Sequence, residues 1–317
     1  MKSVNLLVMG NDPLGYFLVA MLKNFTESVE VEAWIITDTA LTKKLYQQGY
    51  AVIINSKKYD TEFDGSISSI FEIAGEEFDT LLVTDFSKRV IERLSRVSEL
   101  EIKAKHIIIA SKVLYPILAI NKSLLKKIVP YYLVFDGFLC WTDSAIRVFS
   151  GETIYIQKEL QETTFYKALD EALQKTRIQL KVPSNFRSVY WLLTINHAVL
   201  GMLFTLGISP KIAVESKSAR EIYVELLADW ERLLRLEGIR LPELRTFSFR
   251  FIPKIKSIDE RSLEYEKTRI LEEVEFLYHL VQEKTKVRNI TLTSLPLMLR
   301  LIMAIKESSR LRRLKNY

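Results

Sequence analysis

The sequence of 317 residues has few of the side chains that form covalent cross-links or bind transition metals. It contains one cysteine, Cys140, so no disulfide can form within the chain. Its three histidines, His106, His197 and His279, lie far apart, and none has a neighbour at the spacing of a second metal ligand. The sequence therefore predicts a protein without an internal disulfide and without a bound metal.

Long apolar runs are also missing. The longest candidate, residues 189–208, is interrupted by Asn196 and His197, whereas a membrane span needs about 20 consecutive apolar residues. A strand-like run directly after Lys2 leaves no room for a signal peptide. We therefore expect a cytoplasmic protein that contains no membrane segment.

Glycine is scarce, at 10 of 317 residues, against about 7% in an average protein. Two of these glycines are the first and last residues of the hexapeptide Gly-Asn-Asp-Pro-Leu-Gly at residues 10–15. An apolar run of strand character precedes it, and an apolar helical segment follows. This order predicts a dinucleotide-binding turn, in which glycines let the backbone approach a pyrophosphate at the helix N-terminus.

The hexapeptide departs from the G-x-G-x-x-G pattern at its middle glycine, which is Asp12. Aspartate is a favoured helix N-cap and proline is favoured at the first helical position. Asp12 and Pro13 therefore predict a helix start in which the Asp12 side chain accepts a hydrogen bond from the N–H of Leu14 or Gly15. The carboxylate would also repel a phosphate. The turn either retains a dinucleotide site or supports the fold alone.

The net charge of +6 is concentrated at one end of the chain. Residues 306–317 hold one acidic residue and five basic ones, a net charge of +4, the basic ones being Lys306, Arg310, Arg312, Arg313 and Lys315. Such an end either binds nucleic acid or, more often, is a solvated helix end. Residues 245–256 alternate basic and aromatic side chains, which suits a nucleic-acid face, a strand or a buried loop.

Strand and helix signals alternate through the first half of the sequence, which predicts a parallel sheet with right-handed crossovers. The expected strands are residues 31–37, 51–55, 78–85 and 106–111, and the expected helices are residues 39–48 and 87–98. Shorter meander-type strands are expected at residues 131–135, 145–149 and 153–157, followed by a helix at 165–175 and a strand at 178–182.

The pattern changes at Pro183-Ser184-Asn185. Beyond it, apolar residues recur at helical spacing over residues 188–206, 219–237, 265–284 and 294–308. The sequence therefore predicts a Rossmann-like domain with a doubly wound parallel sheet at residues 1–183 and an all-helical domain at residues 184–317.

This order of elements resembles the ketopantoate reductase family, which joins a Rossmann-like domain to a helical domain like that of 6-phosphogluconate dehydrogenase. The resemblance extends over nearly the whole chain, and the order of the segments carries it rather than one specific motif. The matching segments are residues 10–15, 45–52, 78–84, 137–156, 190–196 and 269–308.

The resemblance implies hydride transfer from NADPH to a 2-keto acid, with a lysine as the general acid. The family's lysine lies four residues before the asparagine that matches Asn196, and this sequence has Leu192 there. A carbonyl that becomes an alkoxide needs a proton donor or a fixed positive charge, and leucine supplies neither. The family's glutamate falls near Ile270, and a shift of two or three residues brings Glu272 or Glu273 to its place.

The polar residues of these helices have two interpretations each. Asn196 is either a remnant of a substrate site or a hydrogen-bonding residue between helices. Glu272, Glu273 and Glu275 occupy nearly one helical turn, which is typical of a solvated face. Asn196 and Glu272 are the catalytic candidates.

The implied cofactor contacts are altered as well. Asp38 stands near the position of the family's basic residue, where an acid suits a ribose diol and opposes a 2′-phosphate. If NAD or NADP binds, the resemblance places the contacts at Gly10, Asn11, Asp12, Pro13, Leu14, Gly15, Asp38, Thr84 and Asp85.

The prediction is a divergent ketopantoate-reductase-like protein without ketopantoate reductase activity and with weakened or lost NAD(P) binding. It would act as a non-catalytic regulatory or interaction protein, as a homodimer through the helical domain, with a further protein partner also possible. The alternative is an NAD(P)-dependent oxidoreductase acting on another 2-keto or 2-hydroxy acid. A nucleic-acid-associated role through the basic end is the least favoured.

Overall fold

The structure is a computed structural model, and it describes residues 2–73, 76–112, 128–142, 145–150, 153–236, 238–239, 241 and 260–315. The chain divides into two compact units, Met1–Tyr190 (unit 1) and Trp191–Tyr317 (unit 2). This division falls inside a helix, whereas the sequence placed the domain boundary ahead of it at residue 183. Each unit is described by itself below.

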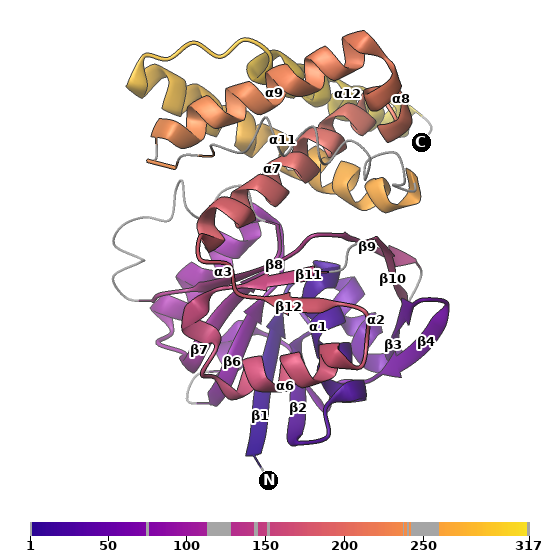
Figure 1. Cartoon of the computed structure of the whole chain (residues 1–317), viewed down its shortest axis with the longest axis vertical. Coiled ribbons are helices and arrows are strands. Elements are labelled where there is room, and N and C mark those ends of the chain that lie inside the picture. The colour runs from indigo at the N-terminus through magenta and orange to yellow at the C-terminus, as the bar shows by residue number, and fades with distance from the viewer. Residues whose placement is uncertain are drawn as a thin grey trace. The chain divides into compact units, whose positions relative to one another are not determined.

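Unit 1 is built on an eight-stranded sheet (Figure 1). Its strands, in spatial order, are β12 (Gln179–Lys181), β11 (Thr153–Ile156), β8 (Tyr131–Phe135), β7 (Lys103–Ala110), β6 (Glu77–Val83), β1 (Lys2–Met9), β2 (Val29–Ile36) and β5 (Gly65–Ile67). The pairs from β8 to β5 are all parallel. Strand β1 lies inside the sheet, and the following strands are added on both of its sides: β2 and β5 on one side, and β6, β7 and β8 on the other. This change of direction at β1 is typical of a Rossmann-like sheet.

One edge of the sheet is antiparallel, because β11 pairs antiparallel with β8. This edge is in the region where the sequence predicts shorter meander-type strands. Between these two strands the chain forms part of a second, four-stranded sheet and then returns in the opposite direction. The second sheet has the order β4 (Lys57–Thr61), β3 (Tyr50–Ile54), β10 (Ala145–Ser150), β9 (Phe138–Thr142). The expected strand at residues 51–55 therefore belongs to the second sheet.

Both faces of the main sheet are buried, which explains why β1 is a continuous apolar run. Leu6 and Val8 pack on one face with helices α1 (Pro13–Phe25) and α6 (Thr164–Gln174). Leu7 and Met9 pack on the other face with helix α3 (Ser87–Glu99). The doubly wound arrangement follows from this alternation. Unit 1 is completed by helix α2 (Ala40–Gln48) and the short 3₁₀ helices Ile70–Ile73 and Lys158–Leu160.

Unit 2 is helical wherever the structure describes regular secondary structure in it, as the sequence predicts. It contains most of α7 (Phe186–Thr205), together with α8 (Pro210–Glu215), α9 (Lys217–Leu236), α11 (Glu260–Arg288) and α12 (Leu295–Lys315). By length and composition α7 could cross a membrane, but 83% of its apolar window is buried, as in a core helix. Residues 245–256 lie outside the described residues.

Candidate functional site

The turn at residues 10–15 joins β1 to α1, and its two glycines are required by contact with Thr84, which follows β6. Gly10 has φ +123°, and a Cβ there would lie 1.9 Å from the Thr84 carbonyl oxygen. A Cβ on Gly15 would lie 2.6 Å from Thr84 Cγ2. These glycines therefore let the turn pack on the neighbouring strand, whether or not a ligand binds.

The N-terminus of α1 is capped as the sequence predicts. Asp12 is the N-cap, its Oδ1 accepts a hydrogen bond from Leu14 N at 2.9 Å, and Pro13 opens the helix. Gly15 N donates to Thr84 Oγ1 at 3.2 Å, and Asp12 N donates to the Thr84 carbonyl at 3.0 Å. Because proline has no N–H, the donors from residue 12 to residue 15 are all used within the chain.

The hydroxyl of Thr84 is at the centre of this arrangement. Besides accepting from Gly15 N, it lies 2.9 Å from the Asp12 carbonyl and 3.0 Å from the Ala110 carbonyl at the end of β7. Thr84 is fully buried. A pyrophosphate on this turn would have to take Leu14 N from Asp12 and Gly15 N from Thr84, so the residues present do not fit that group as they stand.

The outer side of the turn is held by aromatic side chains. Tyr16 Oη donates to the Gly10 carbonyl at 2.6 Å, and Trp141 Nε1 on β9 donates to the Asn11 carbonyl at 3.0 Å. The Tyr16 and Trp141 rings meet edge to face at 5.2 Å. Burial raises the pKa of Tyr16 far above its ordinary value, so this phenol stays protonated and keeps donating. The Asn11 side chain accepts from Thr39 Oγ1 at 3.1 Å.

Arg93 binds both Asp38 and Asp85, the two acidic residues that the sequence predicts as cofactor contacts. Arg93 of α3 donates through Nη1 to Asp38 at 3.0 Å and through Nε to Asp85 at 3.1 Å. Asp85 is buried and follows β6, whereas Asp38 is partly exposed and follows β2. Burial raises the pKa of Asp85 although the Arg93 charge opposes the shift, and the two carboxylates raise the pKa of Arg93 against its own burial.

Beside this bridge is a cavity of about 300 Å³. Its lining includes Asp38, Thr39, Arg89, Arg93 and Arg96. The three arginines are spaced four and three residues apart on α3, so they share one helix face. The spacing of these three arginines in the sequence could have identified Arg93 as a residue of the site.

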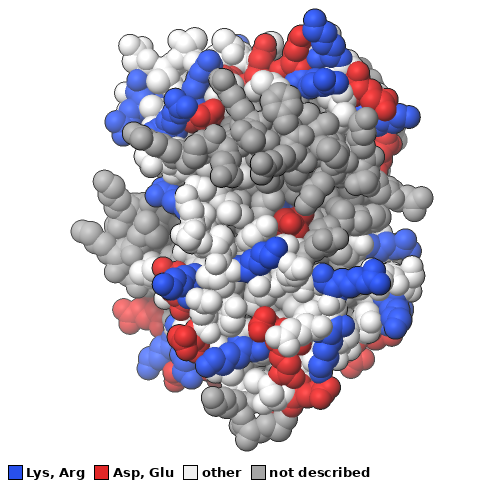
Figure 2. Space-filling model, viewed as in Figure 1, with Lys and Arg blue, Asp and Glu red and all other residues white. Residues whose placement is uncertain are grey.

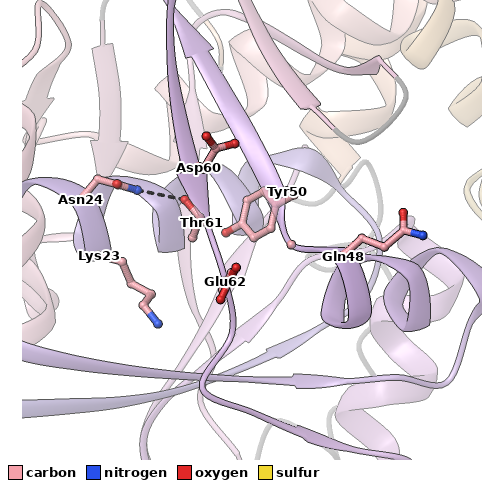
Figure 3. A pocket seen from close by; sticks show the side chains of 8 residues that line it. Lys23, Asn24, Gln48, Tyr50, Asp60, Thr61 and Glu62 are labelled. Atoms are coloured by element: carbon pink, nitrogen blue, oxygen red, sulfur yellow. Dashed lines mark hydrogen bonds between the residues drawn. The ribbon is translucent and has the colours of Figure 1, made fainter.

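A larger cavity of about 420 Å³ lies at the other end of α1 (Figure 3). Asn24 Nδ2 donates to Thr61 Oγ1 at 2.9 Å there, and Lys23 pairs with Asp64 at 2.8 Å. In Figure 3 the polar ends of Lys23, Asp60 and Gln48 lie on different sides of the cavity. Because these groups do not converge on one point, we assign no ligand to it.

In unit 2, Asn196 is fully buried on α7. Its Nδ2 donates to the Leu192 carbonyl at 2.6 Å, and its Oδ1 accepts from the hydroxyl of Tyr223 on α9. Leu192 itself is buried. Of the two interpretations of Asn196, this geometry corresponds to a bond between helices.

Next to it, His197 Nδ1 lies 3.4 Å from Glu266 Oε1, and Glu266 Oε2 lies 2.6 Å from Arg269 Nη2. All three are buried, and Glu273 is buried as well, at 2% exposed. The expectation of a solvated face is therefore wrong for Glu273, because α11 turns it inward with Arg269. Glu272 and Glu275 are exposed.

Within the described residues, no group of three His, Cys, Asp or Glu side chains could hold a metal ion. The absence of a bound metal stays a prediction.

On the face drawn in Figure 2, Lys and Arg side chains are interspersed with Asp and Glu. Of the basic end, Arg310 is exposed on α12; the side chains of Arg312, Arg313 and Lys315 lie outside the described residues.

The fold has close counterparts among solved structures. A ketopantoate reductase of the PanE/ApbA family from Ralstonia eutropha aligns over 98% of this chain and 100% of its own, with a TM-score of 0.69 and 14% identity. The chain has the fold of the ketopantoate reductases. A D-mandelate dehydrogenase solved with NADH and anilino(oxo)acetate aligns over 97% of this chain and 99% of its own, at TM-score 0.68 and 14% identity.

A dimeric ketopantoate reductase from Staphylococcus aureus aligns over 96% of this chain and 99% of its own, with a TM-score of 0.64 and 12% identity. Neither a protein-family model nor a curated protein sequence matches the chain. The resemblance seen in the sequence is thus confirmed in the fold.

Proposed function

We propose that this protein is a non-catalytic protein with the ketopantoate reductase fold and with weakened or lost NAD(P) binding, acting through regulation of, or interaction with, another protein. One observation carries the proposal. The N–H groups that a pyrophosphate would use at the start of α1 are bonded to Asp12 and Thr84. The Asp12 carboxylate also adds a negative charge where a phosphate would bind.

The absence of a general acid at Leu192 supports the same proposal, because the family's chemistry needs a proton donor at the substrate carbonyl. Asn196 cannot replace it, since both ends of its amide are bonded within unit 2. Glu272 is exposed on α11 and has no assigned role.

The proposal is tested by titrating the full chain with NADH and with NADPH, followed by calorimetry. We expect no binding below about 1 mM, where the binding free energy is about −4 kcal/mol. Asp12→Gly should tighten binding, because it frees Leu14 N and removes the charge. Asp12→Asn is the matched control: it keeps the capping oxygen and removes only the charge. Micromolar binding by the unmodified protein would overturn the proposal.

Catalysis is tested separately by NAD(P)H oxidation with ketopantoate and a panel of 2-keto acids. Enzymes commonly turn over at about one per second or faster, and we expect the unmodified protein to stay far below that rate. Leu192→Lys is assayed beside Leu192→Met, which controls for disturbance of the buried site. Turnover near one per second without any substitution would mean that another residue supplies the proton.

The second candidate is an NAD(P)-dependent oxidoreductase acting on a different 2-keto or 2-hydroxy acid. The cavity beside Asp38 favours it, because it lies where a ribose would meet the end of β2. Lys112, just after β7, is the candidate cation, and its Nζ donates to the Gly137 carbonyl at 2.5 Å. Activity lost on Lys112→Met but kept in Lys23→Met would support this candidate.

A further inference from the structure

The core of unit 2 contains four ionisable side chains that the proposed function does not use. They are His197 on α7 and Glu266, Arg269 and Glu273 on α11, and each is at most 4% exposed. The three residues of α11 are spaced three and four residues apart, so they share one face of the helix. Charged side chains are rarely buried so completely unless they are paired. The contacts within this cluster therefore decide its charge.

A close helix crossing brings the cluster together. A Cβ on Gly201 of α7 would lie 3.1 Å from Ile270 Cγ1 and 3.2 Å from the Glu266 carbonyl oxygen, so α7 and α11 approach closely there. One turn before Gly201, His197 Nδ1 lies 3.4 Å from Glu266 Oε1. The other oxygen of Glu266 lies 2.6 Å from Arg269 Nη2. The crossing therefore holds a buried imidazole against a buried carboxylate.

Two opposing effects act on the charge of this imidazole. Burial destabilises the protonated form, whereas a carboxylate within reach stabilises it, and the low dielectric of the interior strengthens that attraction. The cluster offers two carboxylates, Glu266 and Glu273. Arg269 compensates one of them, and an imidazolium at His197 compensates the other.

The neighbouring polar groups do not titrate near neutral pH. Asn196, the residue before His197, accepts a hydrogen bond from the hydroxyl of Tyr223 on α9. Burial raises the pKa of Tyr223 far above its ordinary value, so the phenol stays neutral. We infer that His197 is protonated in the folded protein at neutral pH, and that this proton binds α7 to α11 through Glu266.

This inference goes beyond the proposed function, because it concerns unit 2 alone and holds whether or not a dinucleotide binds. The folded protein keeps the His197 proton to a higher pH than the unfolded chain, in which histidines titrate near pH 6.5. The pair therefore contributes its full stability below about pH 6.5 and loses it as the pH rises through the folded midpoint. Unit 2 is thus stabilised by a proton that alkaline conditions remove.

A titration of the full chain followed by NMR tests the inference directly. The chain has three histidines, so His106→Gln and His279→Gln assign the ring signals of His197 by elimination. We expect a His197 midpoint about one unit or more above the usual value of about 6.5. Glu266→Gln keeps the size of the side chain and removes its charge, so it should lower that midpoint by about one unit or more.

Urea denaturation between about pH 6 and about pH 9 gives a second readout. The unmodified protein should lose stability more steeply with rising pH than His197→Gln does. His279→Gln is the matched control, because His279 is exposed on the same helix, and it should keep the slope of the unmodified protein. Circular dichroism verifies that each variant folds. A His197 midpoint at or below about 6.5, a midpoint that Glu266→Gln leaves unchanged, or equal slopes for the two histidine variants would each contradict the inference.

Discussion

Two helices of this protein are capped by a buried aspartate, and the two caps are built differently. Asp12 caps α1, the helix that it precedes, through one N–H only two residues away. Asp229 lies on α9 and caps a different helix: its Oδ2 accepts from Thr293 N, Ser294 N and Leu295 N at 3.1, 2.8 and 2.9 Å. Asp229 is fully buried.

The difference lies in what each cap holds together. Asp12 fixes the start of a helix that is already buried along most of its length. Asp229 fixes the start of α12 and also attaches it to α9, so it acts on tertiary structure. Substitution of Asp12 should therefore change ligand binding more than it changes the stability of the fold. Substitution of Asp229 should change stability more than it changes ligand binding.

The largest effect is expected for Asp229→Ala. It leaves three N–H groups without their acceptor, and we expect a loss of about 2–4 kcal/mol in the free energy of unfolding. Urea denaturation followed by circular dichroism measures it. Arg232, half-exposed and 2.9 Å from Asp229, gives the control, because Arg232→Gln should change stability by less than about 1 kcal/mol. Equal losses would show that the arginine, and not the capping bonds, matters.

The next effect concerns Thr84, whose hydroxyl connects the turn to two strands. Thr84→Val should cost about 1–3 kcal/mol, because it leaves Gly15 N without its acceptor. Thr80 on β6 is a matched control, since it is fully buried and its hydroxyl has no hydrogen-bond partner among the residues that the structure describes. Thr80→Val should be neutral or stabilising in the same urea titration. A comparable loss at both positions would contradict the role of Thr84.

A smaller effect is expected at Asp12 itself. Asp12→Ala should cost about 1 kcal/mol and Asp12→Gly only a few tenths, because glycine is a tolerated N-cap. Thermal melts of the two variants beside the parent measure the order. A loss at Asp12 larger than that at Asp229 would reverse the comparison between the caps.

The smallest effect is a pH dependence from His106 on β7. Burial lowers the pKa of His106 below its ordinary 6.5, although the Asp79 charge opposes the shift. The unfolded chain therefore takes up the proton first, so stability is fully present above pH 6.5 and declines as the pH falls through the folded pKa. His106→Gln should remove this part of the pH dependence in denaturation curves. An unchanged slope in the variant would exclude His106 as its source.

The sequence predicts those features that depend on neighbouring residues. The strand, turn and helix at the N-terminus follow from local patterns, and so does the Asp12 cap, which spans two residues. The order of the later elements also predicts the two-part fold, because apolar periodicity reports which faces are buried.

The contacts that complete the candidate site could not be predicted in this way, because they join distant segments. Thr84 meets Gly15 from another strand, Arg93 reaches Asp38 from α3, and Trp141 reaches the turn from the second sheet. Glu273 is buried because α11 turns this side of the helix toward the core of unit 2. Three acidic residues within one helical turn do not show which side of the helix faces the core.

The bond between Trp141 and Asn11 links the small sheet to the turn of the large one. Any opening of the turn must break this link and the ring contacts of Trp141 with Tyr16 and Tyr50. The turn and strand β9 should therefore fluctuate as one cooperative unit. In hydrogen exchange, the amides of Asp12 and Gly15 should be released at the same slow rate as those of β9. A slow step of this kind would delay any ligand that needs the turn to open.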